Sequence, residues 1–328
     1  MTATIDRLLA AVRHRTGIDD LDWATQPRPL TGGFWAEMYT VELADPPEHL
    51  AGRLVARIMP DPATAAYETT IQHHLHQHGL SVPAIRAADG PTEHLDRAWS
   101  LMDHANGRPL LAGLNATTAI RQAPTLLRCL PDLLAEAAAA VHHCPIDGLD
   151  LALNGHTRRP DITDFLQRVA QQAVTVGRND LAASAGSITA NAPHTRTICH
   201  GDLHPFNLLV EGQHWTLIDW STAVLADPHY DLAFTSLMLA NPPLGGPAPV
   251  RAATRAVGVR LANRFLRTYQ DRTGNQIDPD RLAWGRQAHA LRALVEIATW
   301  EANGELHTHA GHPWLTMQPV LEGHVTRC

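Results

Sequence analysis

The amino-acid sequence predicts an α+β protein of two lobes, in which a small antiparallel sheet with one helix precedes a larger, mainly helical lobe. Between residues 31 and 102, four strand-like apolar runs surround a single helical stretch. From Asn106 onward, apolar residues recur at helical spacing. Only residues 197–220 break this second pattern, with short apolar runs separated by polar turns. We therefore expect one lobe of residues 1–104 and another of residues 105–328.

The leading segment, residues 1–28, is expected to hold one short helix and a connector. Apolar residues at helical spacing predict the helix over residues 5–15, and the proline-rich QPRPL follows it. Residues 31–43 and 53–59 then predict two strands. The polar, proline-containing ADPPEHLAG between them is typical of a hairpin loop.

A helix and two further strands complete the first lobe. The Asp-Pro pair at 61–62 is typical of a helix start, and this helix is expected to pass through Glu68 and stop at Gly79. Residues 82–88 and 98–102 predict the last two strands. The order strand, strand, helix, strand, strand is that of a small antiparallel α+β unit.

The second lobe is predicted to be helical apart from one insert. Its helices are expected at residues 126–143, 164–174, 249–273 and 279–303. The insert at 197–220 carries the strand-like runs ICH, NLLV and WTLID between polar turns. It is the only β-type segment expected in this lobe.

Composition narrows the class of protein. With 45% hydrophobic and 18% charged residues, the 328-residue chain resembles ordinary globular proteins. A net charge of -7 argues against a nucleic-acid surface, and no apolar run is long enough to cross a membrane. The four cysteines form no CxxC pair, so a reducing cytoplasm is expected. The oligomeric state is left open.

The insert ICHGDLHPFNLLVEGQHWTLIDW carries the residues that suggest chemistry. Asp202 precedes Asn207 by five positions, and Asp219 follows a short hairpin. Phosphoryl transfer from a nucleotide needs a carboxylate that orients the acceptor hydroxyl and oxygen ligands that hold Mg²⁺ on the phosphates. A loop with Asp and Asn, followed by a hairpin that returns a second Asp, can deliver all three groups to one point. This is the H-x-D-x-x-x-x-N…D arrangement of kinases.

The motifs HGDLHPFN, LIDW and ADPHYDLA resemble the aminoglycoside phosphotransferase/choline kinase-like family of small-molecule kinases, which has a protein kinase-like fold. The resemblance implies ATP- and Mg²⁺-dependent transfer of the γ-phosphate to a hydroxyl of an aminoglycoside-like, sugar or amino-alcohol acceptor. It implies Asp202 as catalytic base, Asn207 and Asp219 as Mg²⁺ ligands, and His200 and Asp231 as supports of the loop. His204, in the same loop, could contact the substrate or the metal, but it is expected to pack there.

The first lobe should then hold ATP. LTGGFWAEMY resembles the phosphate-covering turn of the family, with Gly32 and Gly33 letting backbone N–H groups approach the phosphates. The strand RLVARI resembles the family's V-A-I-K strand. Strand alternation puts Val55 and Arg57 on one face, so that Val55 covers the adenine and Arg57 reaches the α- and β-phosphates. Arg57 replaces the usual lysine, in a chain that contains no lysine at all.

The remaining nucleotide contacts follow along the chain. Glu68, in YETTIQHHLHQHGLSVP, stands where the family has the glutamate that pairs with the phosphate-binding cation. LMDHANG resembles the hinge L-M-E-x-x-x-G, and Gly107 frees the turn that follows. The hinge residues expected at the adenine are Met102, Asp103, His104 and Ala105.

Two weaker features concern metal and acceptor binding. His74 and His78 at i, i+4 spacing can bind zinc, but no further ligands stand at suitable spacing, and the chain holds 21 histidines. In the last long helix, Glu296, Trp300 and Glu301 lie off the apolar stripe. These three residues are candidates for binding a cationic or sugar-like acceptor.

Two other functions are open at this point. A nucleotide-binding pseudokinase without transfer activity would explain Arg57 and the imperfect glycine turn, but not the intact Asp202, Asn207 and Asp219. A protein kinase would need an A-P-E segment and a longer connection after Asp219 for peptide docking. Neither is present in the sequence.

Overall fold

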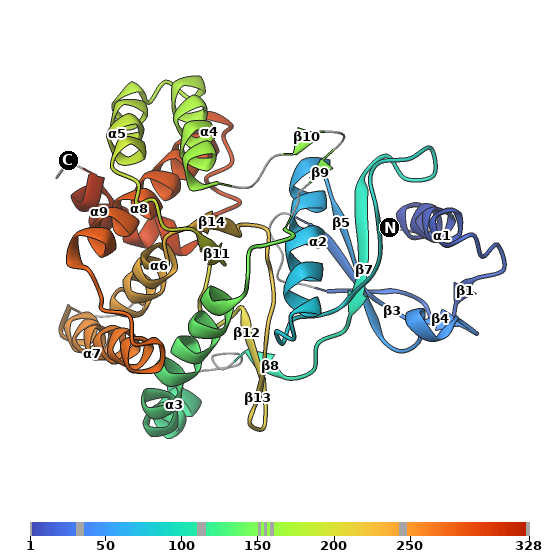
Figure 1. The fold of residues 1–328 in the computed structure, drawn as a ribbon, viewed down its shortest axis with the longest axis horizontal. Helices are drawn as coiled ribbons and strands as arrows, with labels where there is room; N and C mark the ends of the chain where they lie inside the picture. Colours follow the sequence, from blue (N-terminus) through green and yellow to red (C-terminus); the bar gives the residue numbers. More distant parts are fainter. Residues whose placement is uncertain are drawn as a thin grey trace. The chain divides into compact units, whose positions relative to one another are not determined.

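The structure of the protein, a computed structural model, divides into two compact units (Figure 1). The structure describes residues 2–30, 36–109, 116–149, 152–153, 156–157, 161–242 and 248–325. Unit 1 contains residues 1–109, 147–159 and 209–222, and unit 2 contains residues 110–146, 160–208 and 223–328. The segment 209–222 groups with unit 1, although the sequence assigned it to the second lobe.

Unit 1 is built on a five-stranded antiparallel sheet of strand order β2-β3-β5-β7-β6. Its strands are β2 (Arg28–Pro29), β3 (Glu37–Val41), β5 (Leu54–Met59), β6 (Ile85–Asp89) and β7 (Ala98–Asp103). Two short strands pair beside it, β1 (Asp22–Trp23) with β4 (Leu43–Ala44), and a 3₁₀ turn covers Glu48–Leu50. The predicted antiparallel sheet is therefore present.

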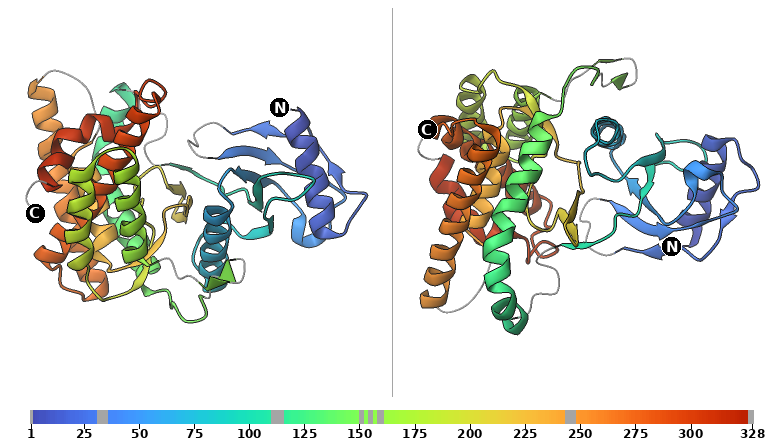
Figure 2. Two further views of the ribbon diagram at one scale, coloured as in Figure 1. Left: turned by 90° about the horizontal axis from the view of Figure 1, so that it is seen from above. Right: turned by 60° about the horizontal axis from the view of Figure 1, so that its bottom comes forward.

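Two helices cover opposite faces of this sheet (Figure 2). Alternate residues of a strand point to opposite faces, so β5 presents Ala56 and Ile58 to one side and Arg57 to the other. Ala56 and Ile58 share a core cluster with residues of α1 (Thr2–Thr16). Arg57 meets α2 (Pro62–Gln77) on the opposite face. The face of the sheet toward α1 is thus part of the apolar core, and the face toward α2 carries the charged groups.

The start and end of α2 follow from local chemistry. The carboxylate of Asp61 accepts hydrogen bonds from the N–H groups of Ala63 and Thr64, which have no partner within the helix. At the other end Gly79 adopts φ 80°, a backbone conformation that favours glycine. The predicted helix is confirmed, and it places Glu68 in its second turn.

A smaller sheet of unit 1 contains β8 (Arg108–Pro109), β12 (Leu208–Glu211) and β13 (His214–Leu217). It is tied to the end of α2 because Leu217 donates a backbone hydrogen bond to the carbonyl of Ser81. Gly107 precedes β8 with φ 97°, and a Cβ there would lie 2.8 Å from the backbone of Val210. Only glycine therefore fits this turn. The strands β9 (Ala152–Leu153) and β10 (His156–Thr157) form a separate pair.

Unit 2 is a helical assembly with one strand pair, β11 (Thr197–Cys199) and β14 (Val224–Ala226). The helix α6 is buried on nearly all sides and packs against α7 and α8. The helices of the described part of the unit are α3 (Ala116–His143), α4 (Ile162–Thr175), α5 (Asn179–Ala190), α6 (His229–Ala240), α7 (Ala248–Thr273), α8 (Pro279–Ala302) and α9 (Pro313–Val325).

The α+β class with a sheet-rich part and a mainly helical part is confirmed. The helices α3, α4, α7 and α8 lie where helical spacing predicted them, whereas α5, α6 and α9 were not predicted. Within the described residues, no helix is both long and apolar enough to span a bilayer.

Candidate functional site

In unit 1 three charged side chains from separate elements meet at one point. Arg57 of β5 places Nη1 3.2 Å from Glu68 Oε1 of α2. Its Nη2 lies 3.2 Å from Asp219 Oδ1, in the segment that follows β13. Arg57 and Glu68 are buried, while the Asp219 side chain is 39% exposed. The expected ion pair between Arg57 and Glu68 is present, and the guanidinium also holds a second carboxylate.

The backbone at Asp219 is held in an uncommon conformation. Its φ of 63° lies in the left-handed region, which non-glycine residues rarely adopt. Ser221 donates a hydrogen bond of 2.8 Å from Oγ to Asp219 Oδ1, beside the contact with Arg57. Strained backbone of this kind persists where surrounding contacts fix it, and it is concentrated at functional sites. The geometry fixes the direction of the Asp219 carboxylate.

Burial raises the pKa of Glu68 to about 7, although the positive charge of Arg57 opposes the rise. The folded protein therefore binds this proton more tightly than the unfolded chain does. By linkage, the stability from protonated Glu68 is fully present below pH 4.5 and is lost as the pH rises through about 7.

Replacing Glu68 by Gln removes this titration. We expect the free energy of unfolding of the wild type, minus that of Glu68→Gln, to fall by about 3 kcal/mol between acidic pH and pH 8. Urea unfolding of both proteins across this range measures the difference, and Glu48→Gln, on the exposed 3₁₀ turn, serves as control. A difference that does not change with pH would show that Glu68 has its ordinary pKa.

The hinge segment is tied to the sheet of unit 1. The Asp103 carboxylate accepts two hydrogen bonds from Arg86, of 2.6 and 2.7 Å. The backbone N–H groups of Asp103 and His104 donate to neighbouring carbonyls at 3.0 Å. Met102 lies in β7, and Ala105 follows the strand. Two of the N–H groups expected to bind the adenine therefore already donate to carbonyls of unit 1.

The other predicted nucleotide-binding residues are Val55 and two glycines. Gly32 and Gly33 lie outside the described residues. Val55 is half-buried in β5, two positions before Arg57, and pairs with Met102 of β7 in the sheet register. Val55 and Arg57 thus share a face, as strand alternation predicts.

In unit 2 the loop after β11 brings the predicted catalytic residues together. Asn207 Nδ2 donates to the Asp202 carbonyl at 2.9 Å and lies 3.3 Å from its carboxylate. His204 Nε2 lies 3.4 Å from Asp202 Oδ2. The Asp202 side chain is 25% exposed, so a hydroxyl from solution can reach it. Because Nδ2 of Asn207 is used in the loop, its amide oxygen is the atom left to bind a cation.

The Asp202 carboxylate is stabilised in its charged form. Burial favours protonation, but His204, Arg292 and His200 outweigh it and hold the pKa of Asp202 well below its usual range. Such a carboxylate is ionised throughout the physiological range and is a weak proton acceptor. It can orient a hydroxyl by accepting its hydrogen bond and take the proton late, when the hydroxyl becomes acidic.

Asp231, at the start of α6, anchors this loop. Its carboxylate accepts hydrogen bonds from the backbone N–H groups of His200 and Gly201, both at 2.7 Å. His142 Nε2 of α3 lies 3.2 Å from the same carboxylate, and its Nδ1 lies 2.8 Å from the hydroxyl of Tyr269. Asp231 and His200 are fully buried. The loop conformation therefore depends on one buried carboxylate.

Three residues near this loop were not predicted. Arg292 of α8 donates from Nη1 to the Gly201 carbonyl at 3.1 Å, and its charge acts on Asp202. His142 and Tyr269 support Asp231 from α3 and α7. Each lies on a long helix far along the chain, and nothing in its local sequence distinguishes it from a packing residue.

The acceptor candidates of α8 have three different environments. Glu296 is half-buried and accepts a hydrogen bond of 3.2 Å from Trp314 Nε1. Burial raises the pKa of Glu296 against the opposing charge of Arg292. Trp300 was expected off the apolar stripe, but this was wrong: it is buried in the core of unit 2 and stacks on His309 with ring centroids 4.2 Å apart. Glu301 is exposed. Of these three candidates, only Glu296 is both partly buried and electrostatically coupled to Asp202.

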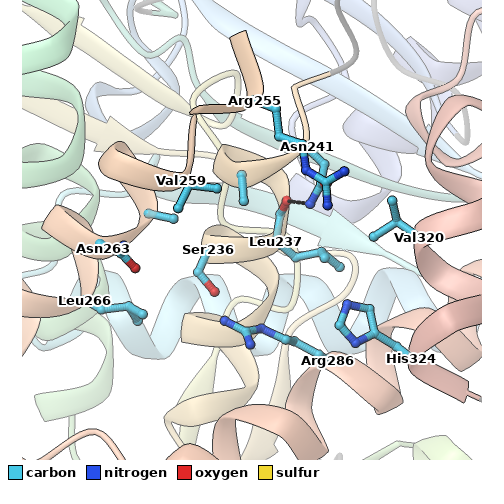
Figure 3. Close-up of a pocket in the computed structure, with 12 residues that line it drawn as sticks. Ser236, Leu237, Asn241, Arg255, Val259, Asn263, Leu266, Arg286, Val320 and His324 are labelled. Atoms are coloured by element: carbon cyan, nitrogen blue, oxygen red, sulfur yellow. Dashed lines mark hydrogen bonds between the residues drawn. The ribbon is translucent and has the colours of Figure 1, made fainter. Parts of the chain in front are cut away.

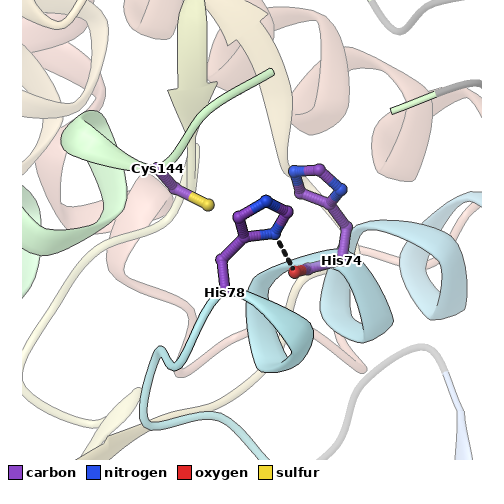
Figure 4. A group of neighbouring side chains, drawn as sticks. All are labelled: His74, His78 and Cys144. Carbon is purple, nitrogen blue, oxygen red and sulfur yellow. Dashed lines mark hydrogen bonds between the residues drawn. The ribbon is translucent and has the colours of Figure 1, made fainter. Parts of the chain in front are cut away.

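The imidazoles of His74 and His78, at the end of α2, lie in contact with their rings tilted by 38° (Figure 4). Their ring centroids are 4.2 Å apart, and Nδ1 of His78 is hydrogen-bonded to the carbonyl of His74 at 2.9 Å. That nitrogen is therefore engaged with the backbone at the end of the helix. The contact is typical of a histidine that caps a helix terminus.

The sequence profile of a phosphotransferase enzyme family matches residues 27–284. This span includes the cluster of Arg57, Glu68 and Asp219 in unit 1 and the loop of Asp202 and Asn207 in unit 2. A comparison with curated proteins finds no significant match.

Solved structures share the fold at low sequence identity. A thermostable mutant of the aminoglycoside phosphotransferase APH(4)-Ia, in a ternary complex with AMP-PNP and hygromycin B, is 15% identical over 98% of both chains, with a TM-score of 0.63. Amicoumacin kinase in complex with AMP-PNP, Ca²⁺ and its ligand Ami is 13% identical over 92% of this chain and 87% of that chain, with a TM-score of 0.60. An aminoglycoside-3′-phosphotransferase of type VIII is 18% identical over 89% and 100%, with a TM-score of 0.57.

Proposed function

The chain belongs to the phosphotransferase enzyme family, and on that premise we propose that it transfers the γ-phosphate of ATP to a hydroxyl group of a small molecule. The observation that carries this proposal is the loop in unit 2, where Asn207 is hydrogen-bonded to Asp202 and the buried carboxylate of Asp231 holds the backbone just before Asp202. No covalent intermediate on the protein is needed, because the acceptor oxygen attacks the phosphorus as the bond to ADP breaks.

Each proposed catalytic group has one task. Asp202 accepts the hydrogen bond of the acceptor hydroxyl and takes up its proton as the new P–O bond forms. Arg57, held in place by Glu68, is proposed to bind the phosphates. Fixed positions reduce the entropy cost of bringing the two reactants together.

The donor set of Asn207 and Asp219 fits magnesium. Mg²⁺ binds carboxylate and amide oxygens, and each of these residues offers one such oxygen. When bound, the ion would neutralise charge on the phosphates during transfer. The strained backbone of Asp219 fixes a carboxylate for this purpose before any nucleotide arrives.

A small organic acceptor is supported by the neighbouring structures, whose ligands are hygromycin B and Ami beside AMP-PNP. At identities below 20% these likenesses do not identify the acceptor. We propose an aminoglycoside-like, sugar or amino-alcohol acceptor, with Glu296, Trp300 and Glu301 as candidate contacts. ATP, Mg²⁺ and such an acceptor are all available in the cytoplasm, which is the proposed location.

Arg57 provides a test of the nucleotide side. Replacing it by Lys keeps a cation beside Glu68, so we expect kcat/KM for ATP to stay within about tenfold of wild type. Replacing it by Met leaves two carboxylates without their cation and should lower kcat/KM by at least about 100-fold. Steady-state kinetics with varied ATP measure both. Wild-type kinetics in Arg57→Met would remove Arg57 from the phosphate site.

A screen of small hydroxyl compounds, with ADP release as the readout, tests the function itself. We expect at least one compound class to stimulate ADP release above the water-dependent background, in a reaction that requires Mg²⁺. If ATP binds but no compound in a broad panel stimulates release, the pseudokinase alternative is correct instead.

A further inference from the structure

A pocket in unit 2 is lined by residues that lie outside the catalytic loop in the sequence. It has a volume of about 230 Å³ and is lined by residues of α6, α7, α8 and α9 (Figure 3). Leu237 and Asn241 line it at the far end of α6, whereas Asp231 anchors the loop at the start of that helix. Asp231 and Asn241 are about 15 Å apart along the helix axis. None of the lining residues is among those proposed to contact the acceptor.

The charge of this pocket is positive. Arg286 of α8 and Arg255 of α7 line it, and no acidic residue is among the lining residues. Arg286 is half-buried, and burial lowers its pKa without any carboxylate acting to raise it. Within the described part of the chain, neither guanidinium has a carboxylate partner. By contrast, Arg264 and Arg272 on α7 are paired with acidic residues of α3.

A half-buried guanidinium without a counter-ion is unfavourable, because it has lost water and gained no opposite charge. An anion bound in the pocket would supply the missing opposite charge. The planar guanidinium of an arginine matches the paired oxygens of a carboxylate or a phosphate. Asn263 of α7 adds an amide to the lining, and Leu237 and Leu266 add apolar surface beside it. These groups suit an anionic head on a short apolar body.

We propose that this pocket binds a small organic anion, a carboxylate or a phosphate monoester, through Arg286 and Arg255. The proposal does not depend on the proposed phosphotransferase activity, because none of the residues involved belongs to the catalytic loop or to the cluster around Arg57.

Calorimetric titration of the full chain with succinate, and separately with methyl phosphate, tests the proposal. Excess AMP-PNP and Mg²⁺ are present throughout, so that phosphate contacts at the nucleotide site are occupied. We expect at least one probe to bind, and binding of succinate alone or of methyl phosphate alone identifies the head group. Arg286→Gln and Arg255→Gln should each weaken binding at least about tenfold. Arg260→Gln, an exposed arginine of α7 outside the pocket, should leave binding unchanged.

The melting temperature without ligand gives an independent readout. Because Arg286 has no counter-ion, Arg286→Gln is expected to melt at the wild-type temperature or above it. The proposal is overturned if neither probe binds the wild type at about 10 mM, a concentration that would detect even a millimolar dissociation constant. It is also overturned if Arg286→Gln binds as the wild type does, or if Arg260→Gln weakens binding as much as Arg286→Gln.

Discussion

Replacing Asp202 by Asn is expected to lower kcat for phosphoryl transfer by about 1000-fold, within the range found for loss of a general base. The amide has nearly the same shape as the carboxylate but cannot take up the proton of the acceptor hydroxyl. The bond from Asn207 Nδ2 to the backbone carbonyl of residue 202 is kept, so the loop should retain its conformation. Initial rates of acceptor-dependent ADP release, at saturating ATP, measure the effect.

Asp271→Asn is the matched control, because Asp271 is exposed on α7 and lies outside the catalytic loop. It should turn over at the wild-type rate. If Asp202→Asn keeps more than about a tenth of the wild-type kcat, Asp202 is not the base. An equal loss in both variants would indicate a general effect of charge.

Replacing Asp231 by Asn is expected to have the second large effect, on both stability and activity. Asparagine offers one acceptor oxygen where the carboxylate offers two, so the N–H of His200 or of Gly201 loses its partner in a fully buried place. An unsatisfied buried donor and the lost ionic hydrogen bonds should together cost about 3 kcal/mol of unfolding free energy. Activity should fall with it, because the same bonds hold the loop of Asp202. Urea unfolding and kcat, measured on the same preparation, give both numbers.

Asp132→Asn is the control for the loss of stability expected in Asp231→Asn. Asp132 of α3 forms an ion pair with Arg264, but both side chains are more than a third exposed. Its loss should therefore cost less than about 1 kcal/mol. Equal destabilisation by the two changes would contradict the anchoring role of Asp231.

Local patterns were sufficient for the sheet of unit 1 and for the charged residues of both units. Strand alternation in RLVARI put Arg57 on the face that α2 covers, and the start of α2 at Asp61 put Glu68 opposite it. The spacing from Asp202 to Asn207 predicted one loop, and the structure shows these residues hydrogen-bonded. In these places, the residues that form the sequence pattern are also the residues that make the structural contact.

Other parts depend on packing that the local sequence does not encode. The helix α6 is buried on nearly all sides, with polar as well as apolar residues inside, so its sequence shows no helical periodicity. Pro319 interrupts the pattern of α9, and small residues weaken that of α5. Arg292 reaches the catalytic loop across 91 positions of sequence, a distance over which no spacing rule operates. These contacts become visible only once the helices are packed.

The central claim is that the γ-phosphate of ATP is moved to an acceptor hydroxyl by the loop that carries Asp202. The most direct measurement follows the label of γ-labelled ATP in the presence of an acceptor found by the ADP-release screen. We expect the label to appear in the acceptor, one phosphate per ADP released, with the wild type and with Asp271→Asn. With Asp202→Asn the label should stay in ATP. Label that reaches the acceptor equally fast with Asp202→Asn, or that appears only as inorganic phosphate with the wild type, would contradict the account.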